Sequence, residues 1–391
     1  MKGLVINVSK YKPGLEVLLE ERINILRGYK VGLVTNHTGL TTEFDNNIDL
    51  LSEKSEVDLI KLFGPEHGVR GNIEAGDKVQ DSRDKRTGLP VYSLYGDNKK
   101  PSSEMLDGLD VLLFDIQDIG VRFYTYISTL FYCMESCAEN DIKFIVLDRL
   151  NPLGRKVEGS IRKKDFESFI GLYPLPHRHG MTAGELALWG RNKFNLKLDL
   201  DIVKLRGWQG QYFDQLNEFW VPPSPGIPHF NTALIYPITC ILEGTNISEG
   251  RGTANPFEYI GAPWIDPYLL KEEISKNNLE GIKFRPVFFK PAFSKHKNKD
   301  CGGLQLFVSD RNKLDTYLTS LTIIKIIFDL YPDRTDWLKI GSENRYFVDL
   351  LMGDNSPRKK LENGLLPQDI INSWNKEKKE FIKERKQFLL Y

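Results

Sequence analysis

Four short runs of aliphatic residues recur in the first 150 positions, and each run ends in polar residues. They are residues 31–34, 59–63, 111–114 and 144–147. The runs are nearly continuous rather than alternating, which is typical of parallel strands covered on both faces. The segments between them leave room for helical crossovers, and we expect helices at 14–27, 123–139 and 182–194. The pattern predicts an open, doubly wound α/β domain.

The predicted helix at 182–194 has a clear start. Thr182 is followed three residues later by Glu185, the pattern of a capping box, in which each residue's side chain bonds to the other's backbone.

A proline-rich segment divides the chain. Residues 221–229 contain four prolines, and proline removes backbone donors and fixes φ, so neither a regular helix nor a central strand passes through this segment. We therefore expect two domains, residues 1–230 and 231–391. The second has a mixed pattern, with a glycine-rich segment at 244–261, a strand at 303–308 and a helix near 314–330.

The pattern of residues near the C-terminus predicts a charged helix. Trp374, Phe381 and Phe388 recur every seven residues among lysines and glutamates. This spacing places the three rings on one side of a helix. We expect that face to pack on its own, C-terminal domain.

Charge and composition remove several classes of function. The 391 residues include 53 basic and 53 acidic side chains, so no uniform field favours nucleic acid or an anionic membrane surface. No apolar run approaches the roughly 20 residues that span a bilayer. The first residues do not form a signal peptide, so we expect a cytoplasmic protein, with an exported form open if a leader has been removed. Four cysteines with no CxxC pair predict neither a disulfide framework nor a metal cluster.

Polar side chains follow each predicted strand. They are Asn36 after the first, Glu66 and His67 after the second, Asp115, Gln117 and Asp118 after the third, and Asp148 and Arg149 after the fourth. Open α/β sheets bind ligands beyond the carboxyl ends of their strands. For Asp118 or Asp148 taken alone, a helix cap or turn former is the favoured interpretation. Glu66 and His67 stand out because Pro65 and Gly68 enclose them in a tight turn, for which neither Glu nor His is favoured.

Arginines and aromatic residues crowd the same region. Arg70 follows His67, and Arg122 precedes Tyr124 and Tyr126. Rings beside arginine, carboxylates and amides suit a sugar, although both tyrosines also fit an ordinary core. His177 and His179 lack a third zinc ligand by spacing, so we expect a loop role near the site for His179. No phosphate-binding loop, dinucleotide fingerprint or GxSxG elbow occurs, which favours acid–base chemistry without a metal or cofactor.

Five strings of sequence carry a resemblance to a known family. They are GLVTNHTG (32–39), FGPEHGVRG (63–71), FDIQDIGVRFYTY (114–126), LDRLNP (147–152) and EGTNISEGRGT (243–253). The chain resembles, from about residue 15 onward, the NamZ-type exo-β-N-acetylmuramidases, which remove N-acetylmuramic acid from the non-reducing ends of peptidoglycan fragments. The resemblance implies a Rossmann-like doubly wound domain, a smaller mixed α/β C-terminal auxiliary domain, and an active site in the cleft between them.

The resemblance and the strand ends together suggest catalytic roles. Glycoside cleavage needs an acid to protonate the leaving oxygen, which we assign to Glu66, with His67 bonded to that carboxyl or to a sugar hydroxyl. The second catalytic group is Asp115 or Asp118 as base or nucleophile, or the acetamido group of the substrate itself.

Arginines are expected to recognise the lactyl carboxylate that distinguishes muramic acid from glucosamine. Arg122 and Arg70 are the first choices and Arg251 the third, because arginine binds carboxylates through two parallel hydrogen bonds. Glu249 and Arg251 could instead cap the seam between the domains. The substrate-binding set that we predict is Asn36, Arg70, Gln117, Arg122, Tyr124, Tyr126, Arg149, His179, Glu249 and Arg251.

Two other functions fit the same residues. Glu66, His67, Asp115 and Asp118 could hold a divalent cation in a metal-dependent hydrolase. Alternatively, the protein binds amino sugars without cleaving them, its two domains closing on the ligand. In each case the partner is a small peptidoglycan-derived sugar, and no obligatory protein partner is evident.

Overall fold

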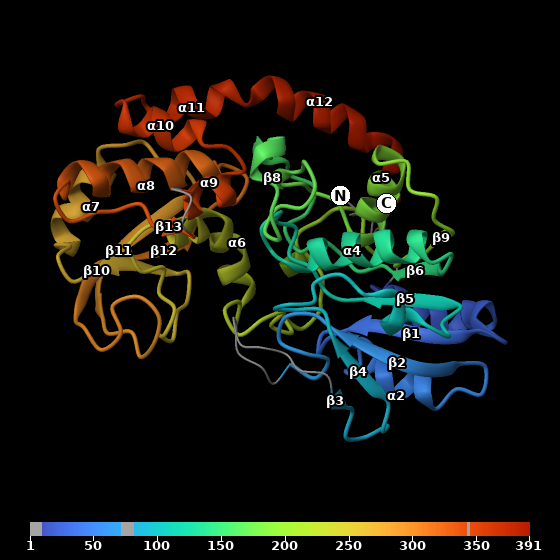
Figure 1. Ribbon diagram of the computed structural model, residues 1–391. Coiled ribbons are helices and arrows are strands. Elements are labelled where there is room, and N and C mark those ends of the chain that lie inside the picture. Colours follow the sequence, from blue (N-terminus) through green and yellow to red (C-terminus); the bar gives the residue numbers. More distant parts are fainter. Residues whose placement is uncertain (1–9, 72–81, 342–344) are drawn as a thin grey trace, which may run out of the picture.

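The larger of two bodies in the molecule is built on a seven-stranded sheet (Figure 1). The computed structural model describes residues 10–71, 82–341 and 345–391. The strand order is β3-β4-β2-β1-β5-β6-β9, and all strands are parallel except β3. Their bounds are β1 Lys30–Thr35, β2 Asp58–Gly64, β3 Ser82–Arg83, β4 Pro90–Ser93, β5 Val111–Asp115, β6 Lys143–Leu147 and β9 Leu200–Val203. The four predicted strands, β1, β2, β5 and β6, are confirmed.

Both faces of this sheet are covered, as the continuous aliphatic runs predict. Val34, Phe114 and Phe144 face a core shared with helices α4 (Tyr126–Glu139) and α5 (Ala183–Lys193). Leu33, Leu113 and Ile145 face a second core, shared with α2 (Asn47–Ser52) and the segment that begins at residue 14. Alternate residues of each strand therefore supply opposite cores, which makes the domain doubly wound.

The order of the strands reverses once. From β1 the chain builds outward through β2 and β4, then returns to place β5 on the other side of β1 and continues through β6 and β9. The carboxyl ends of β1 and β5 thus form a topological switch point, the position where open α/β sheets bind ligands.

The structure confirms the predicted start of one helix and divides another predicted helix into three parts. The capping box at 182–185 is confirmed, since Thr182 Oγ1 accepts from the Glu185 backbone and Glu185 Oε2 accepts from the Thr182 backbone. The segment 14–27 is helical but not one helix. It consists of α1 (Gly14–Val17), a π-helical turn η1 (Leu18–Arg22) and a 3-10 turn η2 (Ile23–Leu26).

The smaller body is a three-stranded antiparallel sheet with helices against it. The strand order is β10 (Tyr259–Ala262), β12 (Cys301–Val308), β11 (Ile282–Phe289). Helices α6 (Phe230–Thr239), α7 (Pro267–Ser275) and α8 (Thr316–Leu330) accompany it. The predicted strand at 303–308 and helix near 314–330 are confirmed.

Short elements of both bodies complete the structure. They are α3 Ser103–Leu106, β7 Glu158–Ile161, η3 Lys164–Phe166, β8 Pro176–Arg178, η4 Phe213–Gln215, η5 Cys240–Gly244, β13 Lys339–Ile340, β14 Arg345–Tyr346, α9 Phe347–Met352, α10 Ser356–Glu362, α11 Pro367–Ser373 and η6 Lys386–Phe388.

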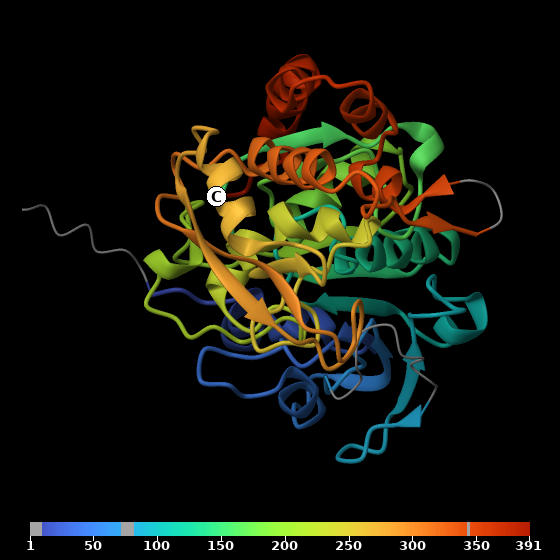
Figure 2. The same cartoon turned by 90° about the vertical axis from the view of Figure 1, so that its left-hand side faces the viewer.

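The charged C-terminal helix exists, but its packing partner differs from the prediction. Helix α12 (Asn375–Arg385) crosses from the smaller body back to the N-terminal body, where it lies beside α5 (Figure 1). Figure 2 shows the red C-terminal helices along the top of the molecule. Phe381 packs against Trp189 with ring centroids 6.1 Å apart. The Trp189 indole donates to Glu384 at 3.0 Å. The expectation that this face packs on its own domain holds for Trp374, whose ring centroid lies 6.4 Å from that of Tyr317 in α8. It is wrong for Phe381, because α5 offers both a ring and a donor.

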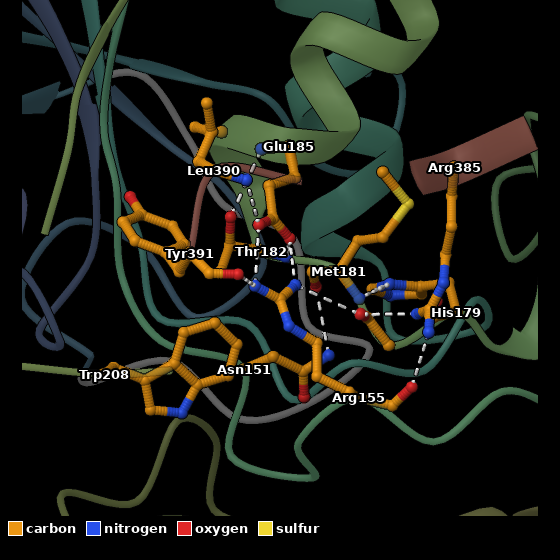
Figure 3. A network of polar contacts seen from close by, with 12 residues as sticks. Asn151, Arg155, His179, Met181, Thr182, Glu185, Trp208, Arg385, Leu390 and Tyr391 are labelled. Carbon is orange, nitrogen blue, oxygen red and sulfur yellow. Dashed lines mark hydrogen bonds and ion pairs between the residues drawn. The ribbon is translucent and has the colours of Figure 1, made fainter. Parts of the chain in front are cut away.

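The last residues of the chain continue this contact into the N-terminal body (Figure 3). Arg385 donates to the backbone carbonyls of His179 and Gly180 at 2.8 and 2.7 Å. The Leu390 backbone donates to Glu185 at 2.8 Å, and Arg155 donates both to Glu185 and to the Tyr391 carbonyl. The C-terminal segment thus fastens the smaller body to the larger one.

Within the described part of the chain, no helix has both the length and the apolar character needed to cross a membrane.

Candidate active site

A cavity lies between the two bodies, at the carboxyl ends of β2 and β4. Glu66 and His67 follow β2, and Tyr95 follows β4. The loop before α4 adds the segment 123–126, and the smaller body closes the opposite side. The lining residues are Glu66, His67, Tyr95, Phe123, Tyr124, Thr125, Tyr126, Phe169, Ile170, Ser224, Gly226, Ile227, Tyr236, Glu243, Arg251 and Phe257.

Glu66 lies in a tight turn whose backbone is strained. His67 has a φ of 76° and Gly68 a φ of 72°, and the Gly68 backbone donates to the Pro65 carbonyl at 2.9 Å. A left-handed conformation at histidine costs free energy, roughly 1–2 kcal/mol, and such residues gather at functional sites. Thr125 donates its hydroxyl to Glu66 Oε2 at 3.0 Å and so fixes the carboxylate against the neighbouring loop.

Aromatic rings form a continuous wall from one body to the other. Tyr126 and Tyr124 have centroids 5.0 Å apart, Tyr124 and Tyr236 5.8 Å, and Tyr236 and Phe257 4.7 Å. The guanidinium of Arg251 lies over Phe257, 4.7 Å from the ring centroid. The Tyr124 hydroxyl is buried in this wall; burial raises its pKa, and Ser224 beside it opposes that shift.

Two carboxylates of the smaller body surround Arg251. Its Nε and Nη2 donate to Glu243 Oε1 at 2.9 and 2.8 Å, and Glu249 Oε1 lies 3.6 Å from its Nε. Glu249 also accepts from Lys295 at 2.9 Å. Burial raises the pKa of Glu243, and the neighbouring Glu249 adds to that shift against the attraction of Arg251. The contacts to Glu243 use the Nε and one Nη2 donor of Arg251, so other donors of the guanidinium remain for a ligand.

Comparisons with known proteins agree over the whole chain. Family models described as "Exo-beta-N-acetylmuramidase NamZ, N-terminal" and "C-terminal" match residues 31–231 and 234–391. A protein of Bacillus subtilis (strain 168) named "Peptidoglycan beta-N-acetylmuramidase NamZ" is 47% identical over 100% of this chain and 94% of its own length. The chain belongs to the NamZ family.

Solved structures extend this likeness. A DUF1343 family protein of Bacteroides fragilis NCTC 9343 is 37% identical, with a TM-score of 0.90 over 98% of this chain and 99% of that one. A second DUF1343 family protein from the same organism is 31% identical, with a TM-score of 0.75 over the same shares. This chain therefore has the two-domain α/β fold that its sequence resemblance implies.

Five of the predicted site residues line the NamZ cavity. They are Glu66, His67, Tyr124, Tyr126 and Arg251. Three more lie directly behind the lining. Asn36 and Asp118 each act on the pKa of Tyr126, and Glu249 supports Arg251. Arg251, the third choice for the lactyl carboxylate, is the only arginine on the cavity wall within the described residues.

Asp115 lies away from the cavity, which contradicts its assignment as a catalytic base. It is fully buried, its Oδ1 accepts from Arg149 Nε at 2.5 Å, and its Oδ2 accepts from Asn47 at 2.7 Å. A carboxylate held by a buried ion pair and an amide is neutralised and shielded from substrate. Asp115 and Arg149 therefore hold the ends of β5 and β6 together.

Arg70 and Arg122, the first choices for binding the lactyl carboxylate, bond to other parts of the protein and do not face the cavity. Arg70 bonds Asp84 at 2.9 Å and Asp49 at 3.0 Å. Arg122 is buried and donates to the carbonyls of Leu175 and Leu351 at 3.1 and 2.6 Å, which joins the two bodies. Burial lowers the pKa of Arg122 to about 9. Neither lines the cavity, so their assignment to the lactyl carboxylate is corrected.

Asp118 and His179 form a buried pair behind the tyrosine wall. Asp118 Oδ2 accepts from the Gly120 backbone at 2.6 Å and lies 3.9 Å from His179 Nε2. Burial raises the pKa of Asp118 to about 7 and lowers that of His179 to about 3, so both groups favour their neutral forms. Gln117 and Arg149 line a different cavity, described below.

The four residues considered for a metal-dependent hydrolase do not all face one cavity. Asp115 is bonded to Arg149 and is not on the same cavity as Glu66. No group of three or more His, Cys, Asp or Glu side chains suited to a metal occurs within residues 10–71, 82–341 and 345–391.

Several lining residues were not predicted from the sequence. Tyr95, Thr125, Tyr236, Glu243 and Phe257 all face the cavity. Thr125 and Glu243 lie inside strings that carry the family resemblance, and this is the one signal that could have identified them. Tyr95, Tyr236 and Phe257 look like core residues in the sequence, and only the packing of the two bodies exposes their rings to the cavity.

Proposed function

We propose that this chain is an exo-β-N-acetylmuramidase, a glycoside hydrolase that releases N-acetylmuramic acid from the non-reducing ends of peptidoglycan fragments. The observation that carries the proposal is a single cavity in which Glu66, a wall of aromatic rings and Arg251 face one another. Family membership supports the same substrate class.

Glu66 is the general acid in this proposal. A glycosidase protonates the departing oxygen while the anomeric carbon develops positive charge. Glu66 is the carboxylate on the N-terminal side of the cavity, and Thr125 holds one of its oxygens at 3.0 Å. This bond orients the carboxyl group on the cavity wall, where it can deliver its proton to the leaving sugar.

The substrate's own acetamido group attacks the anomeric carbon. This assignment is favoured by the position of Asp118, which is 8% exposed and bonded to the turn after β5, behind Tyr124 and Tyr126. A carboxyl in that position does not line the cavity, so it is shielded from the anomeric carbon of the substrate. Participation of the acetamido group predicts retention of the anomeric configuration, which NMR of the freshly released sugar detects. An inverted first product would contradict this step.

Arg251 recognises the lactyl carboxylate. It reaches the cavity from the smaller body, and Phe257 fixes the plane of its guanidinium. Glu243 occupies the Nε and one Nη2 donor of Arg251, and the remaining donors can pair with a second carboxylate. Glucosamine lacks that group, so this contact accounts for selectivity.

Product analysis with MurNAc-GlcNAc disaccharide tests the function. We expect free N-acetylmuramic acid and N-acetylglucosamine, no cleavage of GlcNAc-MurNAc, and the same rate after treatment with a chelator. Saturable binding without product over long incubation would favour the sugar-binding alternative. Loss of activity on chelation, restored by a divalent cation, would favour the metal-dependent one.

A further inference from the structure

A second cavity opens at the topological switch point of the large sheet. Thr38 follows β1, Gln117 follows β5 and Arg149 follows β6, and all three form its base. The Gln117 backbone donates to Thr38 Oγ1 at 2.9 Å and so joins the ends of β1 and β5. Open α/β sheets bind ligands at this point, yet the proposed reaction uses the cavity beyond β2 and β4.

Exposed aromatic rings form the rim of the second cavity. Phe219 is 77% exposed and Phe44 51% exposed, and their rings lie 5.9 Å apart at an angle of 51°. Trp220 stands next to them on the same rim. Aromatic rings that stay exposed to solvent contribute little to the free energy of folding. Beside a cavity, they offer flat apolar faces to a ligand.

The charge of the second cavity indicates a neutral, hydroxyl-rich ligand. The guanidinium of Arg149 at its base is balanced by Asp115 through bonds of 2.5 and 3.1 Å. Glu218 on the lining adds negative charge, which disfavours phosphates and other anions. Thr38, Thr41 and Thr42 supply hydroxyl groups. Aromatic faces with neutral hydrogen-bonding groups suit a sugar ring.

The segment 221–227 contributes lining residues both to the second cavity and to the candidate active site. Val221 lines the second cavity, whereas Ser224 and Ile227 line the first. His37 Nε2 donates to the Pro222 carbonyl at 2.8 Å and Tyr126 donates to the Pro223 carbonyl at 2.7 Å. The segment is therefore pinned to the larger body, and its two ends line different cavities.

We propose that the second cavity binds sugar units of the peptidoglycan chain beyond the bond that is cleaved, with Phe44 and Phe219 as stacking platforms. This inference rests on the proposed function, because the terminal sugar occupies the active site and the remaining chain continues over residues 221–227. Longer substrates then bind more tightly than short ones through contacts that the terminal sugar does not make.

The test compares short and long substrates in the double variant Phe44→Ala/Phe219→Ala. We expect KM for a peptide-free MurNAc-GlcNAc-MurNAc-GlcNAc tetrasaccharide to rise about tenfold, the effect of roughly 1.4 kcal/mol of lost stacking. KM for 4-nitrophenyl N-acetylmuramide should change less than twofold, since that substrate occupies the active site alone. The matched control is Tyr268→Ala/Phe288→Ala, an exposed pair on the smaller body with ring centroids 6.4 Å apart. It should leave both KM values unchanged.

Binding to protein carrying Glu66→Gln separates this inference from the proposed function, because it needs no turnover. Calorimetric titration with the tetrasaccharide should give a Kd about tenfold weaker when Phe44→Ala/Phe219→Ala is added. An unchanged Kd would overturn the second site even if the enzyme is active. A loss seen only with peptide-bearing fragments would also overturn it, in favour of a peptide as the occupant.

Discussion

At the scale of single residues, the proposed selectivity for muramic acid depends on Arg251. Lysine at this position keeps the charge but loses the planar pair of donors that matches a carboxylate. We therefore expect Arg251→Lys to lower the preference for nitrophenyl N-acetylmuramide over nitrophenyl N-acetylglucosaminide by about tenfold in kcat/KM, a loss of about 1.4 kcal/mol. Arg285→Lys is the control, because Arg285 bonds Gln305 on the smaller body. An unchanged preference in Arg251→Lys would contradict this role.

Asp118 gives the protein a measurable dependence of stability on pH. Burial raises its pKa to about 7, whereas an exposed aspartate titrates near pH 4. Between these values the folded state binds more protons than the unfolded state, so this group's contribution to the free energy of unfolding falls as pH rises. Asparagine cannot ionise, and its oxygen can still accept from Gly120. Relative to Asp118→Asn, wild type should lose about 2 to 4 kcal/mol between pH 5 and pH 8.

Urea unfolding of both proteins at the two pH values measures this difference. His179 is present in both, so its own titration cancels from the comparison. Parallel stability profiles for wild type and Asp118→Asn would show that Asp118 is ionised at pH 5 in the folded protein.

Some site residues could be predicted from the sequence and others could not. Glu66 and His67 could, because Pro65 and Gly68 mark a turn that these residue types do not favour. Arginines could not be ranked, since their roles depend on partners distant in the chain. Arg122 is satisfied by Leu351, 229 residues away. The open cavity wall is a property of the packed bodies.

At the scale of elements, α12 stabilises the fold from outside the domain that it belongs to in sequence. Phe381 is 3% exposed and packs on Trp189 of α5. We expect Phe381→Ala to lower the free energy of unfolding by about 3 kcal/mol, because a buried ring is lost and a cavity is left. Lys379→Ala, at an exposed position of the same helix, should change it by less than about 0.5 kcal/mol. Equal effects in denaturant titrations would contradict this packing.

The elements differ in how far the sequence predicts them. β1, β2, β5 and β6 are recognisable because a strand buried on both faces needs a continuous aliphatic run. The seven-residue spacing of Trp374, Phe381 and Phe388 predicts a helix with one buried face. The spacing carries no information about which surface of the protein covers that face. The segment 14–27 has a helical pattern, yet its hydrogen bonding changes twice along its length.

At the scale of the whole molecule, the two bodies share one core. Val34 and Phe114 of the larger body belong to the same buried cluster as Ile235 and Leu304 of the smaller one. Arg122 and α12 add polar and apolar links across the boundary. A shared core predicts cooperative unfolding of both bodies together.

Differential scanning calorimetry should therefore show one transition with equal calorimetric and van 't Hoff enthalpies. Arg122→Met should lower Tm by several degrees and keep the single transition, because two buried carbonyls lose their donor. Two separate transitions in wild type would contradict the shared core.

The most direct test of the whole account is the kcat/KM of Glu66→Gln for MurNAc-GlcNAc disaccharide, measured on protein shown to be folded by its Tm. If Glu66 protonates the leaving sugar, kcat/KM falls by about 10²- to 10⁴-fold, while Asp115→Asn, outside the cavity, retains far more activity once corrected for folded protein. Hydrolysis by folded Glu66→Gln within a few-fold of the wild-type rate would contradict the assignment of this cavity as the active site.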